Sequence, residues 1–286
     1  MKMAIAMQCH ANSEQINKII EFFDDDDIDI YIHIDKKSNI KSEIVTRNNV
    51  YILDNNINVK WGQYSQVEAT LELFKRIKKS SENYKYIHLI SGQDYPVKSL
   101  EEFKEFFYNN NKQYIESEIL PYNKLTKSGR DRYEVYYKDW MIDRPDKIIK
   151  RCIRVAYREF ILGTRIFRRK IDFIDNIYCG SQWFSITNDC LEYILEYLNK
   201  NTNYSNFFRN SIYSDEMFFQ TIVMNSKFAE DIENNNLRYI NWSEQKESPK
   251  NLEIEDIKKA IASKCFFARK INSLKVIEYI DGLWNK

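Results

Sequence analysis

The chain has 286 residues, which suits one large domain or two small ones with a substantial hydrophobic core. Its 43 Lys and Arg residues nearly balance its 42 Asp and Glu residues, so nucleic acid is not an expected partner. The cysteines are scattered and form no C-x-x-C pair, which argues for reduced thiols in a cytoplasmic protein and against a zinc site or a disulfide framework. The five are Cys9, Cys152, Cys179, Cys190 and Cys265.

The first 117 residues alternate between short apolar runs and periodic segments. The initial run in MKMAIAMQC is too short for a signal peptide or a membrane span, and it predicts a first strand. Helical periodicity is clearest where Val67, Leu71, Phe74 and Ile77 share one face. Alternating strands and helices predict a mostly parallel sheet covered on both faces. We expect strands over residues 3–7, 28–34, 50–53, 86–90 and 113–116, and helices over residues 13–23, 65–79 and 100–108.

Residues 118–178 break this alternation and are polar, aromatic and locally basic. Between residues 144 and 170 there are ten Lys or Arg residues and two acids, a net charge of +8. One interpretation is a helix that packs an apolar face on the core and keeps its Arg head groups in water. The other is a peripheral face that rests on anionic lipid, where each basic group contributes about 1 kcal/mol. We favour the first, because the apolar positions do not form one clean stripe.

Residues 179–286 return to alternating elements. Strands are expected over residues 180–186 and 237–242, and helices over residues 188–198, 214–226 and 254–262. Ser214 is well placed as an N-cap. The lack of G-x-G-x-x-G and G-x-x-x-x-G-K-[ST] argues against dinucleotide oxidoreductases and P-loop NTPases. Without a Gly- or Ser-rich linker, we expect one α/β domain with three parts: a nucleotide-binding half (1–117), a variable insert (118–178) and a catalytic and acceptor half (179–286).

Two acidic residues follow predicted strands, at the edge where open α/β sheets bind ligands. Asp94 lies in the stretch SGQDYP, and Asp35 lies in HIDKKS. Nucleotide-sugar enzymes often hold a metal with Asp-x-Asp at such a point, whereas Asp94 has no such partner. The stretch therefore indicates either a sugar-transfer site without a metal or only a turn. His33 alternates with Ile32 and Ile34, which predicts a side chain that is packed or satisfied within the fold.

Charged residues in the last part of the chain admit a structural and a catalytic interpretation. Asp215 and Glu216 stand at a predicted helix start, where acids favourably oppose the helix dipole, but Glu216 is also a candidate general base. An inverting sugar transfer needs one such carboxylate, and no second acid when the leaving group is a nucleoside diphosphate. Arg269 and Lys270 in the stretch FARK are either surface charge or a clamp that stabilises a departing diphosphate without a metal.

The chain resembles the core-2/I-branching β-1,6-N-acetylglucosaminyltransferases and the related peptide O-xylosyltransferases, which form glycosyltransferase family 14. The similar stretches, in order, are HIDKKS, WGQYSQVEAT, LISGQDYPVKS, GSQWFSIT, SDEMFFQT, RYINW, SPKNL and FARK. They extend from about His10 to about Lys270. The resemblance implies a Rossmann-like α/β/α sandwich of the nucleotide-diphospho-sugar transferase (GT-A) type. It also implies inverting transfer from a UDP-sugar to a glycan hydroxyl, with no metal or other cofactor.

The resemblance further implies roles for individual residues. Glu216 matches the catalytic base, and Lys270 matches a lysine that contacts the diphosphate. A second basic diphosphate ligand falls near Lys246 or Lys250. The donor-binding residues implied in this way are His10, near the uridine, Asp35, on the nucleotide side, Asp94, Lys250, Arg269 and Lys270. The acceptor-binding residues are Trp183, Asp215 and Trp242.

The donor sugar and the acceptor stay open in this interpretation. GlcNAc, xylose and glucose are all conceivable donors, and residues 122–170, which match no family motif, are expected to set the acceptor preference. The expected protein is a bacterial, cytoplasmic enzyme of surface polysaccharide or glycoconjugate synthesis. If residues 144–170 rest on anionic lipid, the enzyme would also contact the membrane peripherally. Two alternatives remain: a metal-dependent transferase in which Asp94 helps to hold Mn²⁺, and a non-catalytic carbohydrate-binding protein on the same fold.

Overall fold

A seven-stranded sheet forms the centre of the computed structural model, which describes residues 2–80, 82–142, 148–244 and 248–284. The strand order is β10-β6-β9-β4-β1-β2-β3. All neighbouring pairs are parallel except those of β9, which runs antiparallel to β4 and β6. The prediction of a mostly parallel sheet is therefore confirmed. The strands are β1 (Lys2–Cys9), β2 (Ile28–Ile34), β3 (Val50–Ile52), β4 (Tyr84–Ser91), β6 (Gln113–Tyr114), β9 (Phe184–Thr187) and β10 (Ile232–Glu233).

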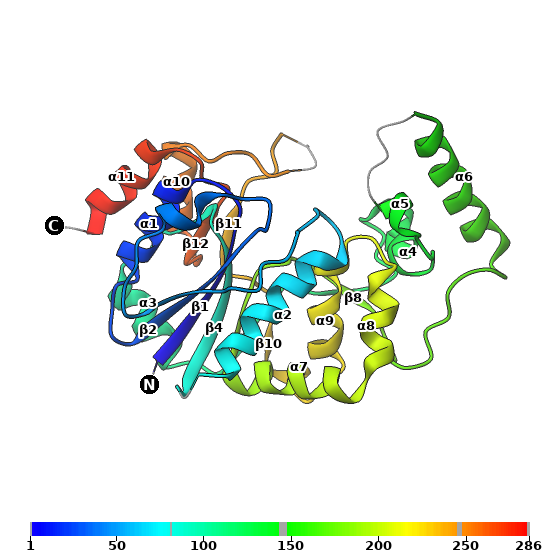
Figure 1. Cartoon of the computed structure of the whole chain (residues 1–286), viewed down its shortest axis with the longest axis horizontal. Helices are drawn as coiled ribbons and strands as arrows, with labels where there is room; N and C mark the ends of the chain where they lie inside the picture. The colour runs from blue at the N-terminus through cyan, green and yellow to red at the C-terminus, as the bar shows by residue number, and fades with distance from the viewer. Residues whose placement is uncertain (1, 81, 143–147, 245–247, 285–286) are drawn as a thin grey trace.

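Helices cover both faces of this sheet, as Figure 1 shows. Successive side chains of a strand point to opposite faces, so Met3, Ile5 and Met7 of β1 join one apolar cluster while Ala4 and Ala6 join the other. The α/β/α sandwich expected from the sequence is thus confirmed. The face that carries Met3, Ile5 and Met7 is covered by α1 (Ser13–Phe22), α3 (Leu100–Tyr108), α10 (Ile254–Ala262) and α11 (Leu274–Trp284). The second is covered by α2 (Tyr64–Lys78), α7 (Asn188–Lys200), α8 (Thr202–Arg209) and α9 (Phe218–Met224).

A second, three-stranded sheet lies beyond the carboxyl end of β4. It has the order β11-β12-β5, with β11 (Arg238–Ile240), β12 (Phe267–Arg269) and β5 (Asp94–Pro96). Strands β12 and β5 pair antiparallel. In their register Arg269 lies opposite Asp94, although the two residues are far apart in the sequence. The last strand thereby brings the FARK stretch to the ligand-binding edge of the main sheet.

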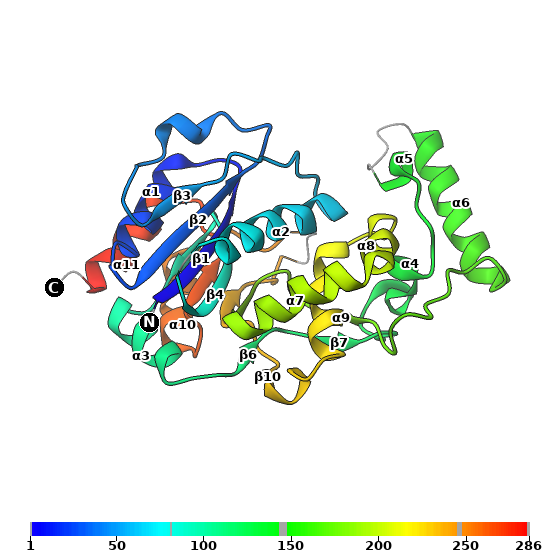
Figure 2. The same cartoon turned by 60° about the horizontal axis from the view of Figure 1, so that its bottom comes forward.

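The predicted insert forms a lobe with a small core of its own. Strand β7 (Glu118–Ile119) pairs with β8 (Tyr178–Cys179) at its base. Between them lie α4 (Arg130–Tyr133), α5 (Asp139–Ile142) and α6 (Ile148–Thr164). Figures 1 and 2 show α6 standing away from the central sheet at one end of the molecule. Within the described ranges, no helix has the length and apolar character needed to cross a membrane.

The structure corrects the favoured interpretation of residues 144–170, of which 144–147 lie outside the described residues. A helix is present, but Ile161 is its only buried residue. Ile149, Ile153 and Phe160 expose 73%, 48% and 55% of their surface, so these apolar residues do not pack on the core. These three residues share one side of the helix, whereas Ile148 and Val155, which are 76% and 47% exposed, lie elsewhere on its surface.

The predicted helix over residues 214–226 is the other main difference. Ser214 to Glu216 form a short 3₁₀ turn, and α9 begins only at Phe218. The Ser214 hydroxyl does not cap this helix, because α9 begins after Met217 and has no side-chain cap; the hydroxyl donates a hydrogen bond to the carbonyl of Phe208 over 2.8 Å. The N-cap prediction is therefore wrong, and Glu216 lies on a tight turn that precedes the helix. Helices α8 and α11 were not predicted.

Candidate active site

A pocket with a volume of about 680 Å³ opens at the carboxyl ends of β1, β2 and β4. His10, Asp35 and Ser91 come from these strand ends and line one side. The insert and the turn that contains Glu216 line another. This is the edge at which open α/β sheets bind ligands, as the sequence analysis expected. The pocket brings most of the predicted site residues together.

The turn that carries Glu216 is fixed by a glycine of the WGQYSQ stretch. Gly62 has a φ of +67°, which favours glycine, and its N–H donates to Oε1 of Gln66 over 2.6 Å. Its carbonyl accepts a hydrogen bond from the Tyr213 N–H over 2.8 Å. A Cβ at position 62 would lie 3.3 Å from the Tyr213 ring, so this close approach also favours glycine. The turn before α2 therefore positions the residues that follow Tyr213.

Glu216 is held by an arginine that the sequence analysis did not identify. Nη1 of Arg132, from α4 of the insert, lies 2.6 Å from Oε2 of Glu216. The Arg132 guanidinium also lies over the Tyr213 ring, 4.7 Å from its centroid. Its side chain is 15% exposed and that of Glu216 is 36% exposed, so the ion pair is partly shielded while the carboxylate still reaches the pocket. The insert thus contributes directly to the geometry of the candidate base.

Asp215 lies next to Glu216 in a different environment. It lines the pocket but is only 7% exposed, and Oδ1 has no hydrogen-bond partner among the described residues. Burial, together with the nearby charge of Glu216, raises the pKa of Asp215 to about 8. Asp215 is therefore mostly protonated at neutral pH, and the ion pair with Arg132 belongs to Glu216.

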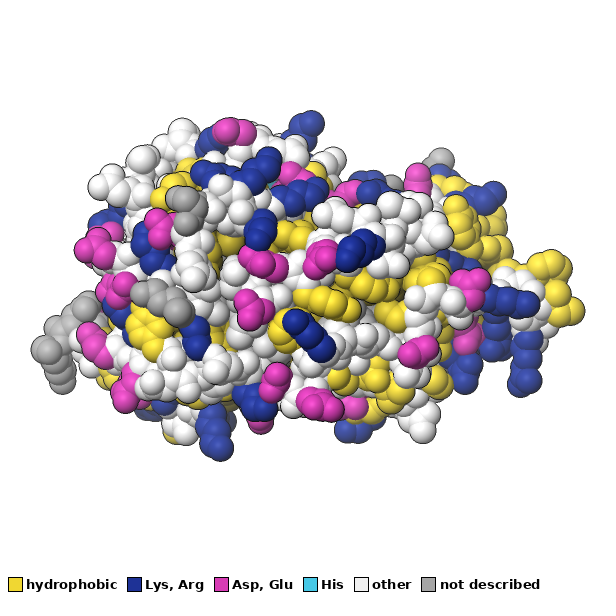
Figure 3. Space-filling model, turned by 90° about the horizontal axis from the view of Figure 1, so that it is seen from below, with side chains coloured by type: hydrophobic (Ala, Val, Ile, Leu, Met, Phe, Trp, Pro, Cys, Tyr) yellow, Lys and Arg dark blue, Asp and Glu magenta, His cyan; other side chains and the backbone are white. Residues whose placement is uncertain are grey.

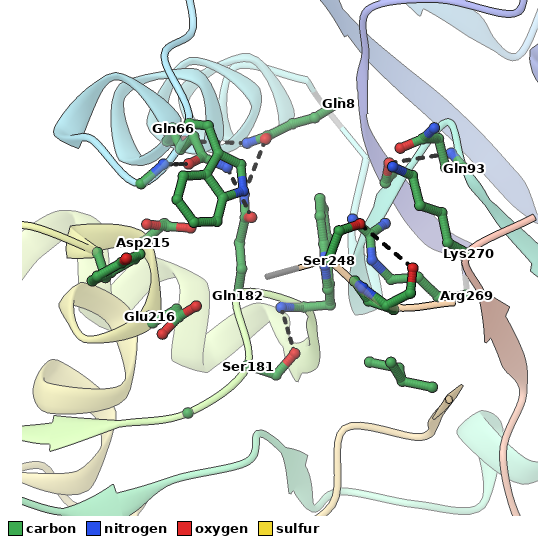
Figure 4. Close-up of a pocket in the computed structure, with 18 of the residues that line it drawn as sticks. Gln8, Gln66, Gln93, Ser181, Gln182, Asp215, Glu216, Ser248, Arg269 and Lys270 are labelled. Carbon is green, nitrogen blue, oxygen red and sulfur yellow. Dashed lines mark hydrogen bonds between the residues drawn. The ribbon is translucent and has the colours of Figure 1, made fainter. Parts of the chain in front are cut away.

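A cationic group lies across the pocket from these acids. Figure 4 shows Arg269 and Lys270 on one side of the cavity and Asp215 and Glu216 on the other. The Arg269 guanidinium stacks on Trp183 at 4.5 Å from the ring centroid, and Nη1 lies 2.7 Å from Oδ1 of Asp94.

The ammonium group of Lys270 forms no hydrogen bond or ion pair with any of the described residues. Burial, followed by the charge of Arg269, lowers the pKa of Lys270. Burial, with Lys270 as the next cause, also lowers the pKa of His10. Burial is the main cause of both shifts, and repulsion between neighbouring positive charges adds to it; an anionic ligand would relieve that repulsion.

Two predicted donor-binding residues do not line the pocket. Asp94 is fully buried, and Oδ2 accepts a hydrogen bond from the Ser91 N–H over 2.8 Å while Oδ1 faces Arg269. Nζ of Lys250 lies 3.0 Å from Oδ2 of Asp256, at the start of α10. Both charges are therefore engaged within the protein. The alternative basic ligand, Lys246, lies outside the described residues.

The remaining predicted residues lie in the pocket wall. Asp35 is 7% exposed and accepts a hydrogen bond from the Lys37 N–H over 3.0 Å. Trp242 is 53% exposed, whereas Trp183 is buried against Arg269 and therefore lies beside the predicted donor residues. The prediction for His33 is confirmed, because this buried ring accepts a hydrogen bond from the backbone of the loop that follows β3.

Three glutamine side chains in the pocket wall also escaped the sequence analysis. Gln182 donates to Oε1 of Gln8, and Gln66 donates to Oε1 of Gln182, each over 3.1 Å. Gln8 in turn donates to Thr70 of α2 over 2.7 Å. Figure 4 shows this network between β1, α2 and the loop before β9. The stretches MQCHAN, WGQYSQ and GSQWFSI contain these residues, but neutral amides gave no charge signal.

His, Cys, Asp and Glu are the side chains that most often bind metal ions in proteins. Within the described ranges, no group of three or more His, Cys, Asp or Glu residues has an arrangement suited to a metal ion. The candidate base Glu216 and its neighbour Asp215 lie across the pocket from Arg269 and Lys270. Arg269 and Lys270 are two positive charges in the pocket wall that an anionic ligand could contact.

Comparison with known proteins gives both distant curated relatives and solved structures. The chain is 24% identical to Xylosyltransferase sqv-6 of Caenorhabditis briggsae over 284 residues, which cover 88% of this chain and 32% of that protein. It is 24% identical to Xylosyltransferase 2 of Rattus norvegicus over 308 residues, which cover 98% of this chain and 33% of the relative. The chain therefore spans about a third of the length of these relatives.

Two solved structures align with most of the chain. The WbbM bifunctional glycosyltransferase has 13% identity and a TM-score of 0.41, with 99% of this chain and 52% of that chain covered. Mouse xyloside xylosyltransferase 1 has 9% identity and a TM-score of 0.37, with coverage of 93% and 96%. The profile of the Core-2/I-Branching enzyme family matches residues 4–264, which is most of the chain. The chain belongs to the Core-2/I-branching enzyme family, whose members are glycosyltransferases.

Proposed function

We propose that this chain transfers a sugar from a UDP-sugar to a hydroxyl group of a glycan, with inversion at the anomeric carbon. The observation that best supports this proposal is the position of the candidate base opposite two cationic side chains. Glu216 stands on one side and the cations Arg269 and Lys270 stand on the other (Figure 4). A donor placed between them would have its diphosphate at the cations and its sugar toward the carboxylate.

The cationic side suits a departing diphosphate. Negative charge grows on the leaving group as the bond to the sugar breaks, and fixed cations stabilise that charge. Lys270 has no acidic partner among the described residues, so it is available to a ligand. Arg269 is oriented by Asp94 below it and by Trp183 beside it, which reduces the entropy lost when a phosphate binds. We assign His10 and Asp35, at the ends of neighbouring strands, to the uridine side of the donor.

Glu216 is the proposed general base. Arg132 holds Oε2, whereas Oε1 forms no hydrogen bond with any of the described residues and is the oxygen that would accept the proton. The acceptor oxygen bonds to the anomeric carbon as the bond from that carbon to the diphosphate oxygen breaks. The hydroxyl proton passes to Glu216, and the electron pair leaves with UDP. Asp215 is only 7% exposed, whereas the Glu216 side chain is 36% exposed, so Glu216 is the more accessible carboxyl group for an acceptor hydroxyl.

The acceptor is expected on the side of the pocket formed by the insert and the exposed aromatic residues. Trp242 and Trp61 line the pocket with 53% and 54% of their surface exposed. Indole rings at such positions stack on the C–H faces of sugars. Trp61 packs edge-on against Tyr213, 5.5 Å between ring centroids, so it is linked to the turn that carries Glu216. We propose Trp61 as an acceptor contact in addition to Trp242 and Asp215.

We further propose that the reaction needs no metal. The alternative in which Asp94 binds Mn²⁺ loses support, because Asp94 is fully buried and both of its oxygens are engaged. All five cysteines are free, in keeping with the cytoplasmic location expected from the sequence. Synthesis of a surface polysaccharide or glycoconjugate is the role that we propose there.

UDP binding and UDP release provide the test of this function. The curated relatives named above are xylosyltransferases, so UDP-xylose is the first donor to assay, followed by UDP-GlcNAc and UDP-glucose. At a hundred times its dissociation constant, UDP should add about 2.7 kcal/mol to the free energy of unfolding. A donor that is turned over should release UDP faster when a suitable glycan is added. Failure of UDP and of all three donors to stabilise the chain would contradict the proposal, whereas binding without release would indicate the non-catalytic alternative.

A further inference from the structure

Helix α6 presents an apolar stripe to solvent. Ile149, Ile153 and Phe160 are spaced by four and seven residues, which places them on one face of an α-helix. They are 73%, 48% and 55% exposed. Phe167, just beyond the helix, is 61% exposed and stacks on Phe160 with 5.8 Å between ring centroids. The stripe therefore continues past the end of α6.

A neighbouring side of α6 holds the helix to the insert. Ile161 is buried in the small core of the insert. The Tyr157 hydroxyl donates to the carbonyl of Tyr136 over 2.9 Å, and the Arg154 guanidinium lies 5.6 Å from the centroid of the Tyr137 ring. These contacts fix the rotation of the helix about its axis. The apolar stripe lies about 100° around the helix from the buried Ile161, on a side that is exposed to solvent.

The surroundings of the stripe are strongly basic. Residues 148–170 contain eight Lys or Arg residues, and Glu159 is their only acid. Lys150, Arg165 and Lys170 are exposed, and their long side chains can extend along the apolar surface while the charge stays at its edge. Figure 3 shows hydrophobic and basic side chains next to each other at the end of the molecule where α6 lies.

This combination selects among the surfaces that could cover the stripe. A second copy would bring the same excess of positive charge against the first, which disfavours self-association. An anionic surface with an apolar interior satisfies both features at once. We propose that α6 lies in the interface of an anionic lipid bilayer, with its apolar stripe inserted and Lys150, Arg165 and Lys170 at the head groups. Because α6 packs on α4, which carries Arg132, this contact would bring the wall of the pocket close to the membrane.

Co-sedimentation with vesicles tests the apolar part of the proposal. The whole chain is mixed with vesicles of phosphatidylglycerol and phosphatidylcholine, and separately with phosphatidylcholine alone, at low and high salt. The stripe variant combines Ile149→Ser, Ile153→Ser and Phe160→Ser, and the control combines Val45→Ser and Leu283→Ser, which are exposed elsewhere. We expect the wild type and the control to bind the anionic vesicles, and the stripe variant to bind about tenfold or more weakly.

A charge variant tests the electrostatic part. Lys150→Glu, Arg165→Glu and Lys170→Glu should lower binding to anionic vesicles by about tenfold or more at low salt, and by less at high salt. The matched control changes three exposed lysines to Glu at the other end of the molecule. These are Lys259 on α10, Lys264 between α10 and β12, and Lys275 on α11. We expect the control to keep most of its binding, and circular dichroism melting should show that all variants fold.

Several results would overturn the proposal. One is wild-type protein that stays in the supernatant with anionic vesicles. Others are equal binding to neutral and anionic vesicles, or a stripe variant that binds as well as the wild type. A lipid-free dimer that the stripe variant dissociates, seen by sedimentation velocity, would assign the stripe to a second copy instead. None of these readouts depends on sugar transfer, so the outcome is separate from that of the proposed function.

Discussion

Nη1 of Arg132 lies 2.6 Å from Oε2 of Glu216, although the two residues are 84 positions apart in the chain. The pair joins the insert to the turn before α9. It orients one carboxylate oxygen and leaves the other toward the pocket. Arg132 is thus a positioning residue, which acts on the reaction through Glu216.

Substitution of Arg132 should therefore lower kcat more than it raises KM for the donor. We expect Arg132→Ala to reduce kcat by about 10- to 100-fold, because the carboxylate loses a charged hydrogen bond and its fixed orientation. Arg132→Lys should recover part of this loss. Arg130→Ala is the matched control, since Arg130 belongs to the same short helix but pairs with Glu134. An unchanged kcat in Arg132→Ala, measured by steady-state UDP release, would contradict the positioning role.

The raised pKa of Asp215 predicts that the stability of the folded protein depends on pH. Its pKa of about 8 in the folded protein lies above the ordinary value of 3.8, so the folded state binds the proton more tightly than the unfolded state. Stability should therefore fall as pH rises from about 4 to about 8. Asp215→Asn removes this titration, so its melting temperature relative to the wild type should rise over that range and level off above it. Parallel melting curves across the pH range would contradict the buried, protonated state of Asp215.

Lys270 should contribute directly to the binding of UDP. A charged hydrogen bond is commonly worth about 1.5–3 kcal/mol, so Lys270→Ala should raise the dissociation constant of UDP by about 10- to 150-fold. Lys36→Ala is a suitable control, because Lys36 is exposed and does not line the pocket. Titration calorimetry measures both constants. Equal affinity of the two variants would show that Lys270 is surface charge.

Chelation tests the proposed independence from metals. Because Arg269 and Lys270 supply the positive charge, we expect UDP release to continue at the same rate in EDTA. We also expect that added Mn²⁺ or Mg²⁺ will change the rate by less than about twofold. Complete loss of activity in EDTA, with recovery in Mn²⁺, would show that a metal takes part and would revive the alternative with a divalent ion.

Much of the fold could be predicted because its elements have strong local patterns. The bounds of β2, α3 and α10 agree with the prediction, since each has apolar residues at the period of its element and clear end signals. The turn at Glu216 could not be predicted in this way. The turn is fixed by the hydrogen bond from the Tyr213 N–H to the Gly62 carbonyl, a contact between residues far apart in the sequence.

The candidate site was predicted only in part, because several of its contacts are long-range. Arg132 lies in a segment without clear periodicity, and its pairing with Glu216 depends on the folded insert. Asp94 has the sequence context of a ligand, but the register of β5 and β12 turns it toward Arg269 instead. The stripe on α6 needs the helix axis and its buried side to be known before the outward residues can be identified.

The most direct test of the whole account is the transfer rate of Glu216→Gln. The amide keeps the size of the side chain but cannot accept the acceptor proton, so kcat should fall by about 10²–10⁴-fold. The dissociation constant of UDP should stay near that of the wild type, because Glu216 lies across the pocket from Lys270 (Figure 4). Glu118→Gln, another carboxylate in the pocket wall, serves as the control. Near-normal turnover by Glu216→Gln would contradict the assignment of the catalytic base and, with it, the mechanism proposed for this chain.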